Sequence, residues 1–76
     1  MTVSKNDLRD ALAAMIAESK ADVEFAKEQG RRMDAWTFGL FRDGTIATAY
    51  ALAAKFGLEN LTETAANLPK KSCLTK

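Results

Sequence analysis

The stretch AWTFGLFRDGTIATAYALAAKFGL, residues 35–58, decides the fold of this chain of 76 residues. It contains the only tryptophan, the only tyrosine and three of the four phenylalanines. Aromatic side chains are large and apolar, so they dominate the energetics of a small core. We therefore expect the rest of the chain to be organised around this stretch.

Two adjacent residues in the middle of the stretch, Asp43 and Gly44, allow two different folds. An Asp-Gly pair between apolar and β-branched residues is a signal for a β-hairpin, which would cover residues 36–50 and give an α+β protein. The alternative is a helix over residues 34–56, capped by Asp34 and broken or bent near the Asp-Gly pair. The stretch continues as an alanine-rich run without a turn signal, and alanine is the strongest helix former. We therefore predict an all-α fold and keep the hairpin as the alternative.

A long amphipathic helix is predicted before this stretch. Ser4 is placed as its N-cap, with the acidic Asp7 three residues later in the manner of a capping box. Good helix formers follow without Pro or Gly until Gly30, which tolerates the positive φ found after a helix end. A helical projection of residues 5–29 gathers the predicted buried face in one arc: Leu8, Leu12, Met15, Ile16, Val23 and Ala26.

Short connections link the predicted helices. Residues 30–32 form a turn short enough to return the chain antiparallel to the first helix. Gly57 followed by Leu58 predicts a Schellman-type helix end. Asn60 with Glu63 predicts the cap of a last short helix.

The expected organisation is a single helical domain over residues 1–68, an antiparallel helical hairpin plus a short C-terminal helix. That last helix should end at about Asn67, because the residue before Pro69 is biased away from helical conformation. Residues 69–76 are predicted to be a flexible basic tail.

The chain is expected to complete its core as a homodimer. A domain of this size buries little surface, and its single cysteine, Cys73, offers no internal disulfide. On the predicted second helix, Met33, Trp36 and Leu40 share one side, whereas Phe38 and Phe41 share the other. The predicted helix is therefore apolar nearly all round. Both apolar sides of such a helix must be buried. The first helix can bury one side, and a second copy of the chain is expected to bury the other.

The composition argues against catalysis and against a membrane span. The chain has no histidine, which removes the commonest general base and metal ligand, and its four glycines match no phosphate-binding loop. We therefore expect no enzyme, catalytic residue, cofactor or metal site. Arg42 and Asp43 would lie near the middle of any span through residues 35–58, so no membrane is expected. A single cysteine fits a reducing compartment, so the expected location is cytoplasmic.

A surplus of aromatic residues beside arginines gives the candidate binding site. Tryptophan, tyrosine and arginine are the residues that dominate protein–protein interfaces. The predicted partner-binding residues are Trp36, Phe38, Phe41, Arg31, Arg32 and Arg42. We predict a small helical protein-interaction module, a regulatory or inhibitory factor that binds a protein partner.

A DNA-binding regulator is the alternative function. Residues 49–68 carry the alanine, the turn glycine and the following apolar residue of a helix-turn-helix. Glu59 and Glu63 would then face phosphate groups, where lysine or arginine is expected. The net charge of the chain is only +1. A nucleic-acid partner is therefore less favoured than a protein partner.

Overall fold

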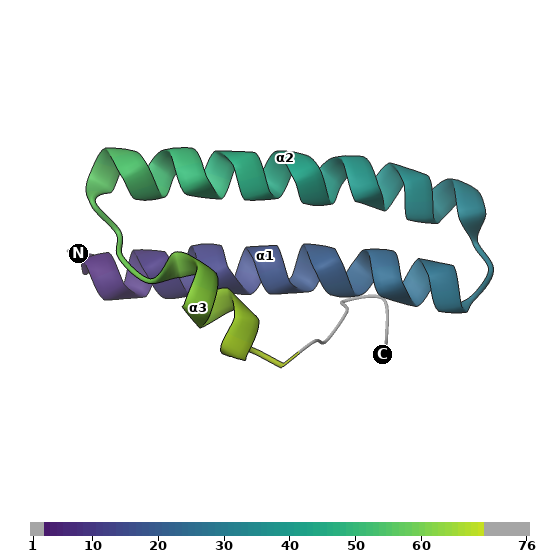
Figure 1. The fold of residues 1–76 in the computed structure, drawn as a ribbon, viewed down its shortest axis with the longest axis horizontal. Helices are drawn as coiled ribbons and strands as arrows, with labels where there is room; N and C mark the ends of the chain where they lie inside the picture. Colours follow the sequence, from purple (N-terminus) through teal and green to yellow (C-terminus); the bar gives the residue numbers. More distant parts are fainter. Residues whose placement is uncertain (1–2, 70–76) are drawn as a thin grey trace.

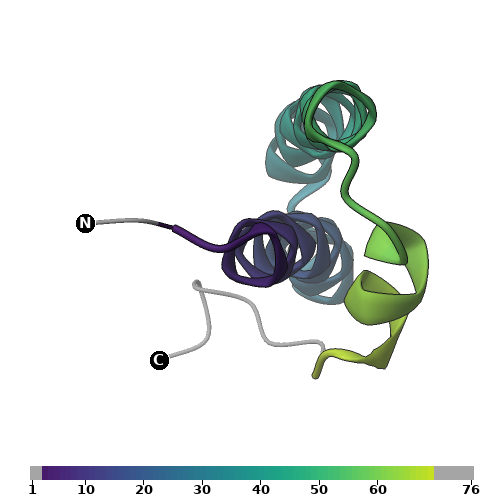
Figure 2. The same ribbon diagram turned by 90° about the vertical axis from the view of Figure 1, so that its left-hand side faces the viewer.

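The computed structural model describes residues 3–69, which form three helices and contain no strand. Helix α1 spans Lys5–Glu28, α2 spans Arg32–Phe56 and α3 spans Leu61–Asn67. The two long helices run antiparallel, and α3 lies beside the N-terminal half of α1 (Figure 1). Seen end-on, α1 stands at the corner of an L, with α2 above it and α3 to one side (Figure 2). The predicted all-α hairpin with a short third helix is confirmed, and the predicted tail after Pro69, with Cys73, lies outside the described residues.

The ends of α1 follow the sequence closely. The Ser4 Oγ accepts a hydrogen bond of 3.0 Å from the Asp7 backbone N–H, so the predicted N-cap is confirmed. At the other end Gly30 has a φ of 68°. Its N–H donates to the Lys27 carbonyl at 3.0 Å, and the next N–H donates to the Ala26 carbonyl at 2.9 Å. These two bonds complete a Schellman motif that directs the chain into α2.

Helix α2 is continuous through Asp43 and Gly44, so both the predicted break and the alternative hairpin over residues 36–50 are wrong. Asp43 does not cap a new helix; its carboxylate pairs with the Arg42 guanidinium at 3.1 Å. An interior glycine costs about 1 kcal/mol relative to alanine. Packing offsets this cost, because Ala49 and Ala53, beyond the glycine, are buried in the core against α1.

The predicted cap of α2 is also wrong. The helix begins at Arg32, two residues before Asp34, and Arg31 occupies the N-cap position. The Asp34 carboxylate accepts a hydrogen bond from the Arg31 side chain. An acidic residue in the first turn still interacts favourably with the positive end of the helix dipole.

The chain turns sharply between α2 and α3. Gly57 has a φ of 67°, and the Leu58 N–H donates to the Ala53 carbonyl at 2.9 Å, which confirms the predicted Schellman-type end. Asn60 stands at the N-cap position of α3, but among the described residues its side chain makes no capping hydrogen bond. Its φ of 64° places it in the left-handed region, whereas a capping side chain needs an extended backbone.

Alanine and leucine side chains from all three helices form the core. Its buried residues are Leu12, Ala13, Ile16, Ala49, Ala53, Leu58, Leu61 and Ala65. Of the predicted buried face of α1, Val23 and Ala26 are also buried and Leu8 is half-buried. Met15 is 55% exposed, contrary to the prediction. It lies at the edge of that face and lines a hollow with Phe41 and Thr45 of α2, and no residue of α3 takes part in that lining.

Candidate interaction surface

Helix α2 exposes large apolar side chains on two different sides. Trp36 is 64% exposed and Phe41 is 65% exposed, although both belong to a well-formed helix. At 3.6 residues per turn their directions differ by about 140°. The two side chains therefore belong to two separate surfaces.

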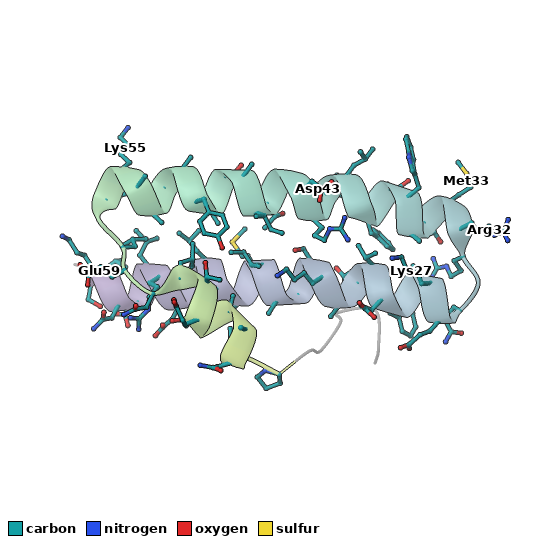
Figure 3. All side chains as sticks on the ribbon, viewed as in Figure 1. Lys27, Arg32, Met33, Asp43, Lys55 and Glu59 are labelled. Atoms are coloured by element: carbon teal, nitrogen blue, oxygen red, sulfur yellow. The ribbon has the colours of Figure 1, made fainter. Side chains whose placement is uncertain are left out.

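The first surface points away from α1, and we call it the outer face. It consists of residues that are all exposed and uncharged and that fall within an arc of about 80° on α2: Met33, Trp36, Leu40, Gly44, Ala47, Ala51 and Ala54. Figure 3 shows Met33 and Lys55 at opposite ends of α2, both directed away from α1. Lys55 and Asp43 flank the outer face on opposite sides.

The second surface is a groove between α1 and α2. One part has a volume of about 470 Å³, and its lining is mostly apolar: Leu12, Met15, Leu40, Phe41, Gly44, Thr45, Thr48, Ala49 and Leu52. A neighbouring part of about 380 Å³ is lined by Met15, Glu18, Ser19, Asp22, Phe38, Phe41 and Thr45. The two parts share Met15, Phe41 and Thr45, so they form one groove. Within residues 3–69 its lining comes from α1 and α2 alone and includes no residue of α3.

The predicted partner-binding residues do not form a single patch. Phe38 and Phe41 line the groove together. Trp36 lies on the outer face and, with Arg42, borders a small hollow of about 260 Å³ on the other flank of α2. Arg31 and Arg32 are exposed at the N-terminal end of α2, away from both phenylalanines.

Two of the three predicted arginines are engaged within their own helix. Arg31 forms an ion pair with Asp34, and Arg42 forms one with Asp43. Exposed pairs of this kind contribute little to stability, at most about 1 kcal/mol. They do reduce the positive charge that these arginines present to a partner. The exposed apolar residues, rather than the arginines, are therefore the main features that the two surfaces offer to a partner.

Comparison of the chain with protein-family models, with curated proteins and with solved structures finds no match. The site must therefore be interpreted from its own geometry. Within residues 3–69 no group of three or more Cys, Asp or Glu side chains is arranged to hold a metal ion. Over the same residues, none of the three helices combines the length and hydrophobicity that a membrane span requires.

Sequence reasoning missed Met15 as a member of an exposed surface, and it left Met33 and Leu40 out of the predicted binding residues although it placed them beside Trp36 on one side of the helix. The helical spacing of Met33, Trp36 and Leu40 was a usable signal for the outer face, because these residues lie three and four positions apart. Met15 carried no comparable signal. Whether the edge of α1 is covered depends on the side to which α3 folds, which the periodicity of α1 does not encode.

Proposed function

We propose that this protein is a small helical interaction module, a regulatory or inhibitory factor that binds a protein partner in the groove between α1 and α2. One observation carries the proposal: Phe41 is 65% exposed and lines both parts of a continuous groove. An exposed aromatic side chain within an apolar surface is typical of a binding site. The proposed function involves no catalysis. We propose that the protein acts in the cytoplasm, because its single cysteine fits a reducing compartment.

The form of the groove favours an amphipathic helix as the bound segment. The groove follows two antiparallel helices, so a third helix can lie along it with apolar residues at helical spacing. Met15, which lines both parts of the groove, has a flexible side chain that adapts to different partner surfaces. The exposed Glu18 lines one part of the groove, which favours a basic residue at the corresponding end of the partner helix.

Site-specific photo-crosslinking tests this function. A photoreactive aromatic residue replaces Met15 in the groove, and in a matched variant it replaces Glu24, an exposed residue of α1 outside the groove lining. We expect an adduct with another protein in a native lysate from position 15 only. Adding Phe41→Glu to the position-15 variant should abolish the adduct. Identical adducts from both positions, or an adduct that survives Phe41→Glu, would contradict the proposal.

The DNA-binding alternative stays a prediction, and no observation favours it over the groove. The exposed residues of α3, the expected recognition helix, are Thr62, Glu63, Ala66 and Asn67. None of these side chains is basic, whereas recognition helices approach phosphate groups with lysine or arginine. Salt-sensitive retention of the protein on duplex DNA would revive this alternative.

A further inference from the structure

We propose that the outer face of α2 binds the outer face of a second copy of this chain, antiparallel, about a two-fold axis that passes near Gly44. This face is distinct from the centre of the groove, so the dimer does not depend on the function proposed above. Leu40 and Gly44 border both surfaces, but Phe41 and Met15 lie outside the outer face.

The distribution of side-chain sizes supports this pairing. The N-terminal half of the outer face carries large side chains, those of Met33, Trp36 and Leu40. Its C-terminal half carries small ones, those of Ala47, Ala51 and Ala54. A two-fold axis places each end of the face against the opposite end of its copy. Antiparallel pairing therefore sets bulky residues against alanines, whereas parallel pairing would set bulky against bulky.

The spacing of these residues is symmetric as well. Counted from the midpoint between Asp43 and Gly44, Trp36 and Ala51 lie equally far away in opposite directions. The same holds for Met33 with Ala54 and for Leu40 with Ala47. In an antiparallel pair each bulky side chain thus meets an alanine at its own level along the axis. Gly44, whose Cβ position has no neighbouring atom within 4 Å, lies at the crossing, where the two backbones approach most closely.

Charges at the border of the face agree with the same arrangement. Lys55 flanks the outer face near its C-terminal end, and Asp34 lies at the N-terminal end of α2 on the same flank, where its carboxylate also pairs with Arg31. Antiparallel pairing brings Lys55 of each copy towards Asp34 of the other. Asp43 lies close to the axis on the opposite flank, and its carboxylate is already paired with Arg42 at 3.1 Å. The two copies therefore bring two compensated carboxylates together, which weakens their repulsion.

Thiol crosslinking of mixed variants tests the arrangement. Cys73, the only cysteine, is first replaced by serine in the full chain. One variant then carries Leu40→Cys and another carries Ala47→Cys, and a short bifunctional thiol reagent is added to each alone and to their mixture. We expect efficient crosslinking only in the mixture, because position 40 of one copy faces position 47 of the other. Crosslinking that is most efficient within one variant alone would overturn the antiparallel arrangement.

Sedimentation of charged variants tests the face itself. Ala51→Glu places a carboxylate on the outer face, and the matched control Ala14→Glu makes the same change at an exposed position of α1. We expect Ala51→Glu to weaken dimerisation by roughly a hundredfold or more, since a buried unpaired charge is costly. The control should remain a dimer, and circular dichroism should show both variants helical. A monomeric parent protein at micromolar concentration, or a dimer that persists in Ala51→Glu, would overturn the proposal.

Discussion

The backbone N–H of Leu58 donates a hydrogen bond of 2.9 Å to the carbonyl oxygen of Ala53, across the left-handed Gly57. This bond ends α2 and turns the chain towards α3, and it leaves the Leu58 side chain buried in the core. The turn from α2 to α3 therefore depends on the left-handed conformation of Gly57.

Gly57→Ala should destabilise the protein by about 1 kcal/mol, because a Cβ is unfavourable in the left-handed region. Chemical denaturation at a fixed protein concentration measures the change. Gly39→Ala is the matched control, since Gly39 is helical and an added Cβ would meet only the Arg42 Nη2 at 3.9 Å. The control should gain up to about 1 kcal/mol. Equal stability of Gly57→Ala and the parent would contradict this account of the turn.

Ser4→Ala should cost about 1 kcal/mol, since it removes the side-chain acceptor of the Asp7 N–H at the start of α1. Ser19→Ala is the comparison, because the Ser19 hydroxyl donates a hydrogen bond to the Ile16 carbonyl within the same helix. Alanine is the better helix former there, so Ser19→Ala should be neutral or stabilising. Thermal unfolding followed by circular dichroism compares the two. A larger loss for Ser19→Ala than for Ser4→Ala would contradict the capping argument.

Leu61→Ala should destabilise the protein by about 2–4 kcal/mol, because it leaves a cavity where α3 packs into the core. Leu61 is only 4% exposed, while its neighbour Thr62 is exposed. Amide hydrogen exchange should show α3 losing protection first. Thr62→Ala removes the hydroxyl that pairs with Tyr50, and it should cost no more than about 1 kcal/mol. If both substitutions have the same small effect, α3 does not pack as described.

Dimerisation should depend little on salt, since the outer face is uncharged and apolar contacts are not screened. Sedimentation equilibrium at low and high ionic strength measures the dependence. We expect the dimer to persist at high salt, with only a small change from the flanking Lys55 and Asp34. Dissociation on adding salt would instead indicate an interface dominated by charges.

Features set by a few neighbouring residues could be predicted from the sequence. The Ser4 cap and the two glycine-dependent helix ends at Gly30 and Gly57 follow from local backbone chemistry, and the structure confirms them. Helix α1 was predicted over residues 5–29 and spans Lys5–Glu28 for the same reason.

Features that depend on distant contacts were not predictable in the same way. The Asp-Gly signal at Asp43 and Gly44 is local, but packing of Ala49 and Ala53 against α1 keeps α2 continuous. Met15 is exposed because the groove that it lines is bordered, within residues 3–69, by α1 and α2 and not by α3. The aromatic residues of the candidate site could be named from the sequence, and their role in binding stays a prediction. Their division between the groove and the outer face follows only from an unbroken α2.

The most direct measurement uses the fluorescence of Trp36, the only tryptophan in the chain. In a single copy its side chain is 64% exposed, whereas an antiparallel dimer would cover it with the alanines of the second copy. We predict emission at short wavelength at micromolar concentration, and a shift to longer wavelength on dilution or in Ala51→Glu. Emission of a solvent-exposed tryptophan that stays constant at every concentration would contradict the dimer.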